Sequence, residues 1–295
     1  MSRLFFRFLR YNWWLGVCVL ALFAQHGRAQ DKPYFVTYSQ DLEEPGNLEL
    51  ESKTAVARPD GDHRYGAPAL ELEYGLRGWW TTELYLDGQA TDDDSAIFTG
   101  FRLENRVRLL MQEHALNPLL YVEYENISGA DKTMLEVVGH DEQADLTGAN
   151  GRLRRGHKHE AELKLILSSN VKDWNISENF IAEKNLGHQP WEFGYAVGVA
   201  RPLSSAARGR PCTFCAEKLI AGVEAYGGLG DTDSLTMHAT SHYIAPALGW
   251  QLPKGVRVSF SPGFGLTGSS LARVYRAGLA YEFEQVGGWF HGGAE

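Results

Sequence analysis

Once its first 29 residues are set aside, the sequence has no apolar run long enough to cross a bilayer as a helix. A transmembrane helix needs about 20 consecutive, mostly apolar residues, so this absence excludes a helical membrane protein. Positive charge is also scarce, with 28 basic against 37 acidic residues and a formal net charge of −9. So acidic a chain is poorly suited to contact nucleic-acid phosphates or anionic lipid surfaces, and we expect no nucleic-acid partner.

The first 29 residues predict export. Arg3, Arg7 and Arg10 precede an apolar run over 13–24, and a small-residue cleavage site follows at 27–29. This is the order of a secretory signal peptide, and the run is too short for a permanent anchor. Cleavage there removes four arginines and no acid, which moves the net charge to about −13. We therefore expect an exported protein of a Gram-negative bacterium.

Only two cysteines, Cys212 and Cys215, follow this leader. No histidine comes directly after Cys215, which excludes a covalent haem signature, and no second pair is present to complete a zinc site. In an exported chain, two cysteines at this spacing favour a short-loop disulfide. We predict that disulfide, and we expect no cofactor.

What the sequence has in abundance is alternation with a period of two residues. In one segment, Leu70, Leu72 and Tyr74 share one face while Glu71 and Glu73 share the other. Successive strand residues point to opposite faces of a sheet, so the alternation predicts strands with one apolar and one polar face. Twelve segments carry it: 47–57, 68–76, 79–87, 96–109, 118–126, 158–168, 171–183, 191–201, 216–227, 239–252, 254–265 and 272–283.

The lengths of these segments and of their connections favour a membrane barrel. A tilted strand needs roughly 9–11 residues to cross a bilayer, and most of the twelve segments reach that length. Outer-membrane barrels also alternate short turns with longer loops. The same alternation is visible here, with tight turns at 75–78, 168–170 and 253–255, longer loops at 87–95, 127–157 and 227–237, and exceptions at 185–190 and 202–215.

We therefore predict an all-β fold, a single antiparallel transmembrane β-barrel of about 12 strands over residues 47–283. A signal peptide at 1–29 and a lead-in segment at 30–46 precede it, and an extension at 284–295 follows it. The main rival fold is a soluble periplasmic β-sandwich, in which the apolar faces would pack against each other.

The stretch 66–87, especially Glu71-Leu72-Glu73-Tyr74-Gly75-Leu76-Arg77-Gly78-Trp79, resembles the first hairpin of a family of Gram-negative outer-membrane barrels. That family is often labelled as phenol-degradation-pathway or transporter-like proteins. The segments 46–51 and 191–201 are similar in character. The resemblance implies an outer-membrane barrel of undefined solute and brings no established site residues with it.

The last predicted strand, 272–283, alternates aromatic and apolar residues and closes on Phe283. It resembles the C-terminal signal by which outer-membrane barrels are recognised for insertion, which implies the barrel-assembly machinery as a partner. Twelve further residues follow Phe283, whereas most such proteins end at the aromatic residue.

In a barrel the polar faces must point inward, because an Arg or Lys facing lipid costs about 2–4 kcal/mol at the midplane. The N-terminal strands then form a charged lumenal wall, made of Glu71, Glu73, Glu83, Arg102, Glu104, Arg106, Arg108, Glu123, Glu160, Glu162 and Lys164. The later strands form a wall of small residues, made of Gly194, Ala196, Gly198, Ala245, Ala247 and Gly249. We expect the free volume of the lumen to lie along the small-residue wall.

Two interpretations of the charged wall remain open. Its arginines can pair with glutamates on neighbouring strands and fill the barrel as a polar core, or the same side chains can line a narrow conduit for a small, apolar or cationic solute. A barrel of about twelve strands lies between packed eight-stranded barrels and wide porins, so strand number does not decide between them.

Three positions depart from the strand pattern. Glu178 falls on an apolar face, and Pro246 and Pro262 interrupt otherwise regular strands. Proline has no N–H for the ladder, so we expect a bulge or a kink at these positions. The alternative is a gap in the wall that lets an apolar solute leave sideways.

Catalytic and metal sites are weakly indicated. His238, Thr240 and His242 share a face, but threonine stands where a barrel lipid hydrolase would carry its serine, and Ser241 points the other way. His157 and His159 share a face without a third metal ligand. The run Asp92–Asp94 is expected to be a solvated loop that could hold a divalent cation weakly.

The sequence thus predicts an outer-membrane barrel, in contact with lipid, that passes or binds a small molecule without catalysis. A plugged structural or surface barrel is the first alternative, and an outer-membrane lipid hydrolase is the second.

Overall fold

The computed structural model describes residues 32–59, 63–132, 148–187, 189–204 and 215–286. The predicted signal peptide, Cys212 and most of the C-terminal extension lie outside these residues. Within them the chain forms twelve strands: β1 (Leu48–Ala57), β2 (Tyr65–Arg77), β3 (Trp80–Thr91), β4 (Ala96–Arg108), β5 (Asn117–Ser128), β6 (His157–Val171), β7 (Trp174–Asn185), β8 (Trp191–Pro202), β9 (Leu219–Asp231), β10 (His242–Gln251), β11 (Val256–Gly265) and β12 (Arg273–Phe283).

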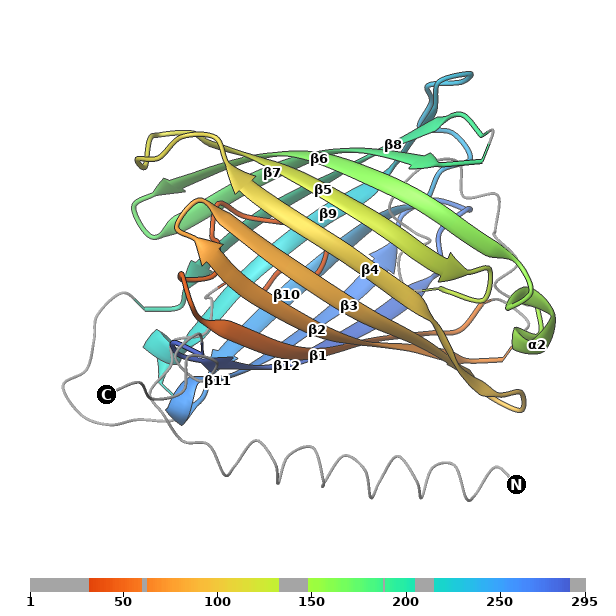
Figure 1. Ribbon diagram of the computed structural model, residues 1–295, viewed down its shortest axis with the longest axis horizontal. Coiled ribbons are helices and arrows are strands. Elements are labelled where there is room, and N and C mark those ends of the chain that lie inside the picture. The colour runs from red at the N-terminus through yellow and green to blue at the C-terminus, as the bar shows by residue number, and fades with distance from the viewer. Residues whose placement is uncertain (1–31, 60–62, 133–147, 188, 205–214, 287–295) are drawn as a thin grey trace, which may run out of the picture.

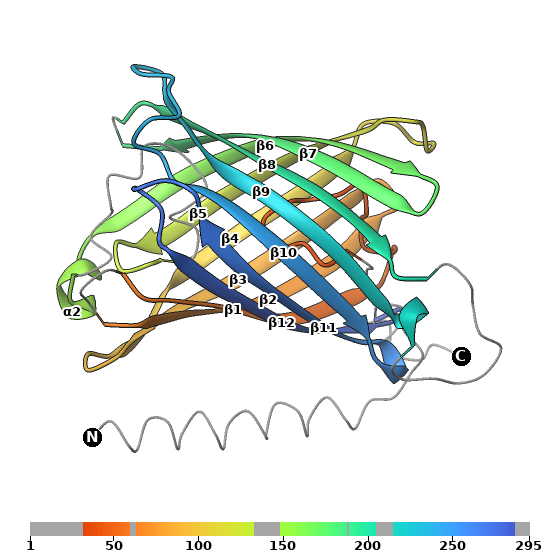
Figure 2. The ribbon, with the colours of Figure 1, turned by 180° about the vertical axis from the view of Figure 1, so that it is seen from behind.

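Every strand pairs antiparallel with its neighbours along the chain, and β12 closes the sheet on β1 into a barrel (Figures 1 and 2). The closing register sets Leu48 opposite Phe283 and Ala57 opposite Val274. Closure leaves no unpaired sheet edge, which a barrel in lipid requires. The prediction of a single twelve-stranded barrel is confirmed, and the β-sandwich is excluded.

The outer face of the barrel is apolar. Because side chains alternate along each strand, almost every inward residue is buried while its neighbour faces outward. The outward set includes Leu70, Leu86, Leu103, Leu120, Val122, Leu163, Leu165, Ile176, Phe180, Val223, Ile244, Leu248, Phe260 and Phe264. An apolar belt of this extent is the surface that bilayer hydrocarbon covers.

Helices are few in the described residues. They comprise the single turn α2 (Asn150–Leu153) and the 3-10 turns η1 (Ala216–Lys218) and η2 (Pro253–Gly255). None of them has the length and the apolar character that crossing a bilayer would need.

We call the end of the barrel where β1 begins and β12 finishes the terminal end, and the opposite end the far end. Several strands run further than predicted, so some turns move: the β6–β7 turn lies at Lys172–Asp173 and not at 168–170. At the far end, β3 continues to Thr91 and β9 to Asp231. Period-two patterns weaken where strands leave the bilayer, which explains the early boundaries.

The bulges lie at other positions than predicted. Register shifts occur in the β2–β3 pair between Gly75 and Arg77, in the β3–β4 pair next to Gly88, and in the β8–β9 pair next to Gly194, with the extra residue on β2, β4 and β9 respectively. Strand β7 keeps a continuous register through Glu178, so this carboxylate faces outward and is exposed without any bulge. The expectation of a bulge at Glu178 was wrong.

Between β10 and β11 the register is unbroken, but the ladder is interrupted. Pairing holds from Tyr243 to Ile244 and resumes at Leu248. At this register Pro246 lies opposite Pro262, so neither strand has an N–H to donate at that point. The two prolines therefore produce a local gap in strand pairing and not a bulge.

Candidate functional site

The lumen is occupied by the chain's own lead-in. Residues 32–44, here called the lumenal segment, run inside the barrel before β1 begins, and both ribbon views show this first part of the described chain between the walls. Val36, Thr37 and Glu43 are buried there. Sequence reasoning placed a lead-in at 30–46 but did not place it in the lumen.

The strongest anchor of the lumenal segment is Glu224 on β9. Its carboxylate accepts the backbone N–H groups of Phe35 and Val36, each at 2.9 Å, and that of Thr37 at 2.7 Å. Glu224 is 0% exposed. A buried carboxylate is costly unless it is bonded, and hydrogen bonds to an ionised acceptor are the strong kind. The backbone of the segment therefore supplies the donors that this glutamate needs.

Strand β7 contacts the same segment through two asparagines. Asn179 accepts the N–H of Tyr38 at 2.6 Å and donates to the carbonyl of Tyr38 at 2.9 Å. Asn175 accepts the Tyr34 hydroxyl at 3.0 Å. Burial, with Glu224 nearby, raises the pKa of the Tyr34 phenol well above its ordinary value, so it remains a donor. These contacts fix the segment along β7.

The small-residue wall is where the segment packs. The six residues predicted for this wall are buried on the inner face: Gly194, Ala196, Gly198, Ala245, Ala247 and Gly249. A Cβ placed on Gly198 would lie 2.7 Å from Cε1 of Tyr34, and one on Gly249 would lie 3.3 Å from Cβ of Pro33. The expectation of free volume along these strands was wrong, because the lumenal segment fills that space.

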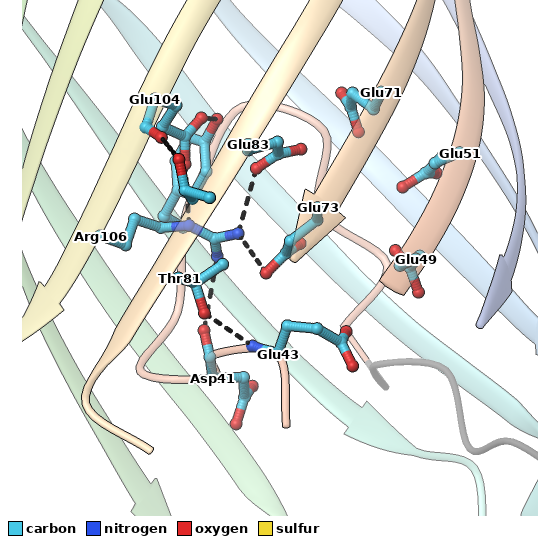
Figure 3. A network of polar contacts seen from close by, with 12 residues as sticks. Asp41, Glu43, Glu49, Glu51, Glu71, Glu73, Thr81, Glu83, Glu104 and Arg106 are labelled. Atoms are coloured by element: carbon cyan, nitrogen blue, oxygen red, sulfur yellow. Dashed lines mark hydrogen bonds and ion pairs between the residues drawn. The ribbon is translucent and has the colours of Figure 1, made fainter. Parts of the chain in front are cut away.

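The charged wall also lies where the inward parity puts it. Ten of its eleven predicted residues are buried, and Arg108 is partly exposed. Arg106 contacts three carboxylates, Glu73 at 2.6 Å, Glu104 at 2.8 Å and Glu83 at 3.1 Å (Figure 3).

Two other cations of the wall form ion pairs, and Arg108 donates to the carbonyl of Gln40 at 3.1 Å. Arg102 contacts Asp87 at 2.9 Å and Glu123 at 3.7 Å, and Lys164 contacts Glu162 at 2.6 Å. The pairs of Arg102 join neighbouring strands, as the polar-core interpretation expects, whereas Lys164 and Glu162 both lie on β6.

The segment bridges this charged wall as well. The hydroxyl of Tyr38 donates to Glu104 at 2.9 Å, and the ring of Tyr38 meets that of Tyr121 edge-on with centroids 5.0 Å apart. Arg106 donates to the carbonyl of Asp41 at 3.4 Å, which Figure 3 shows beside the arginine. Burial, with Glu104 close by, raises the pKa of the Tyr38 phenol well above its usual range. The segment thus spans from one wall to the other.

Charges on the later strands were missed by the sequence reasoning. Arg257 on β11 bonds Glu49 at 2.9 Å and Glu51 at 3.0 Å, and Arg276 on β12 contacts the hydroxyl of Tyr226. Both arginines occupy inward positions in the alternation of their strands, so the sequence pattern could have identified them. The conclusion that these strands carry only small inward residues was wrong.

Part of the inner surface is apolar. A buried cluster joins Val36 of the segment to inward residues of the wall, which are Ala55, Ala57, Tyr65, Ala67, Ile181, Ala196, Tyr226, Tyr243, Ala245 and Val274. The sequence analysis assigned only charged or small residues to the inner face of the barrel and did not predict this cluster. The lumen therefore contains an aromatic, apolar cluster as well as the charged wall, and the two share strand β2.

The histidines form no exposed catalytic group. Nε2 of His242 lies 2.8 Å from the Thr240 hydroxyl, and Nδ1 lies 3.0 Å from the Tyr195 hydroxyl. Thr240 is 0% exposed, so an ester cannot reach its oxygen in this conformation. His238 is exposed in the loop between β9 and β10.

The remaining predicted sites have structural contacts. His159 bonds the hydroxyl of Tyr124 at 2.8 Å, while His157 is exposed. Asp94 accepts the backbone N–H of Asn150 at 2.6 Å. No set of three or more His, Cys, Asp or Glu side chains suited to a metal ion occurs in the described part of the chain. Cys215 is buried and disulfide-bonded, and its predicted partner lies outside the described residues.

No protein-family model matches this sequence, and no curated protein matches it either. Solved structures do match. An outer-membrane channel from Pseudomonas putida F1 has a TM-score of 0.50 at 11% identity, over 86% of this chain and 100% of that one. The KdgM porin and the NanC porin have TM-scores of 0.49 and 0.46 at 10% identity, over 81% and 79% of this chain and 99% and 98% of theirs. At these identities the similarity concerns the fold alone, and the chain has the fold of an outer-membrane β-barrel.

Proposed function

We propose that this protein is a passive channel of the bacterial outer membrane for a small solute, and that its lumenal segment is a movable plug. The observation that carries the proposal is how the plug is held. Residues 32–44 take no part in strand pairing, and side chains of the barrel hold them. The barrel closes through β1 and β12 without them. The plug can therefore leave the lumen while every strand pair stays intact.

The chemistry of the two walls favours a solute with an apolar body. The cations of the charged wall are used in ion pairs with its own acids, whereas the apolar cluster offers the rings of Tyr65, Tyr226 and Tyr243. The resemblance to barrels labelled as phenol-degradation-pathway proteins supports the same class. We therefore propose a small aromatic or similarly apolar molecule as the solute, and the barrel-assembly machinery as the partner for insertion.

A deletion tests the channel proposal. Purified full-length protein and a variant lacking residues 33–43 are compared by conductance in planar bilayers and by liposome swelling. We expect low conductance for the full-length protein and at least a tenfold increase for the deletion, with unchanged heat-modifiable gel mobility as the control for folding. Equal, negligible conductance of both proteins would show a permanently closed structural barrel.

The gap between β10 and β11 favours a second route for apolar solutes. Pro246 is exposed on the lipid side, and the adjoining residues Ala245 and Ala247 face the lumen. Sheet ladders hold barrel walls together, and this one lacks bonds where the two prolines meet. We propose this seam as a sideways exit into the membrane for solutes that prefer hydrocarbon to water.

A further inference from the structure

Two carboxyl groups in contact hold the end of the plug that leads into β1. Glu43 closes the lumenal segment, and its carboxyl group shares a hydrogen bond with that of Glu282 on β12. Both residues are buried. An ionised carboxylate only accepts hydrogen bonds, so two carboxyl groups can bond each other only while one of them carries a proton. The contact therefore exists while the pair holds a proton and is lost when both carboxyl groups are ionised.

The surrounding donors do not replace that proton. Asn47 donates to one oxygen of Glu282 at 2.5 Å, while the other oxygen is buried and has no amide, hydroxyl or ammonium donor among the described residues. The backbone N–H of Glu44 reaches Glu43 at 3.2 Å. A proton shared between the two acids supplies the donor that Glu282 lacks.

The charges around the pair oppose its ionisation. Glu49 on β1 and Glu73 on β2 act on Glu43 from the neighbouring strands. The nearby cations are already taken: Arg257 bonds Glu49 and Arg106 bonds Glu73. Around the pair itself, the charged groups that act on Glu43 or Glu282 are Glu44, Glu49, Glu73 and Glu284. All four are acids, so a second negative charge at Glu43 is repelled.

We propose that Glu43 and Glu282 form a proton-operated latch, which holds the plug in the lumen while the shared proton is present and releases the plug when that proton is lost to water. This inference rests on the channel function proposed above. It predicts a barrel that opens as the solution becomes alkaline.

The direction follows from the two states of the plug. In the closed state, burial and the carboxylates of Glu73 and Glu282 raise the pKa of Glu43 from 4.5 to about 9. In the open state the segment is in water and the pKa of Glu43 is near its ordinary value. A raised closed-state pKa means that closure is fully favoured below the lower value and is lost as pH rises toward the higher one. One proton changes the closed-to-open ratio by up to tenfold per pH unit.

Conductance of the full-length protein between pH 5 and pH 9.5 tests the latch. We expect wild-type conductance to rise with pH, and E43Q to remain closed and insensitive to pH, because the amide introduced at this position can donate to Glu282 at every pH. E282Q should also flatten the profile. The matched control is E160Q, since Glu160 is a buried lumenal carboxylate whose partners are Asn185 and Lys158 and not the pair; it should retain the wild-type profile. Heat-modifiable mobility verifies folding of each variant.

A wild-type profile in E43Q, or a conductance that falls as pH rises, would overturn the latch. The deletion of residues 33–43 keeps the two proposals apart. If the deletion conducts while the wild-type profile is flat, the latch fails and the channel stands. If the deletion does not conduct, the channel proposal itself fails.

Discussion

Glu224 and Val36, 188 positions apart in the chain, meet through a single 2.9 Å hydrogen bond from the backbone of the plug to the wall of the barrel. The same carboxylate holds the two residues that flank Val36. This one side chain thus fixes three consecutive peptide groups, and it is the position at which the plug is most easily disturbed.

Replacing the anchor with its amide should open the channel. In Glu224→Gln the charge is lost and one oxygen becomes an NH₂ that faces backbone donors, so the charge-assisted bonds weaken. We expect a loss of about 1.5–3 kcal/mol in plug binding, and hence a roughly tenfold to hundredfold higher open probability in single-channel recordings. The control is Glu160→Gln, a buried lumenal carboxylate whose known partners, Asn185 and Lys158, are not in the plug. An equal effect of both changes would contradict a specific anchor.

Adding one methyl group to the small-residue wall should also displace the plug. In Gly198→Ala the new Cβ would lie 2.7 Å from Cε1 of Tyr34 and 3.0 Å from Cγ2 of Thr37, so these two side chains of the plug must shift away from β8. We expect conductance to increase several-fold while the mobility of the folded barrel is unchanged. Gly66→Ala is the matched control, since its Cβ would meet only a carbonyl oxygen at 4.0 Å. Unchanged conductance in Gly198→Ala would argue against tight packing at this site.

The charged wall should matter for stability. Arg106→Ala leaves Glu73, Glu83 and Glu104 without their shared cation, and breaking a buried ionic network from one side costs about 3–5 kcal/mol. We expect the heat-induced mobility shift to occur at a clearly lower temperature. In Arg64→Ala, by contrast, an exposed pair with Asp92 is removed, and such pairs contribute about 0–1 kcal/mol. Similar unfolding temperatures for the two variants would refute the role of Arg106.

Restoring the missing donors should close the seam. The double change Pro246→Val and Pro262→Val returns an N–H to each strand, and two new hydrogen bonds are worth roughly 1–3 kcal/mol in total. We expect higher thermal stability together with slower uptake of an apolar fluorescent solute into proteoliposomes. Pro68→Val, on β2 and away from the β10–β11 seam, is the control. A stabilised barrel with unaltered uptake would rule out the sideways route.

The barrel itself could be predicted because lipid imposes its pattern on every strand. A charge at an outward position is expensive, so residues such as Arg106 and Lys164 reveal their inward direction through simple alternation. All twelve strands follow from this rule. The exposed Glu178 shows the limit of this rule, since a single outward charge is tolerated and does not indicate a bulge.

The occupancy of the lumen could not be predicted in the same way. Residues 33–38 have no alternation, because they pair with no strand, and their partners on β7 and β9 lie about 140 to 190 positions away. The glycines of β8 and β10 are equally compatible with an empty lumen beside them and with a segment packed against them. Only the fold brings Tyr34 against Gly198 and so decides between the two.

The bulge at Gly75 has a mechanical consequence. The N–H of Gly46 donates to the carbonyl of Gly75 at 2.8 Å, the N–H of Gly75 donates to the carbonyl of Asn47 at 3.2 Å, and Asn47 also accepts the N–H of Gln285. A side chain on Gly75 would strike the carbonyl of Glu44, so the crossing fits only glycine. These bonds fix the point at which the plug joins the barrel, and a plug that has left the lumen stays tethered to it by a chain of at most about 47 Å. Return is then an intramolecular event, so the speed of reclosing should be independent of how many copies of the protein the membrane holds.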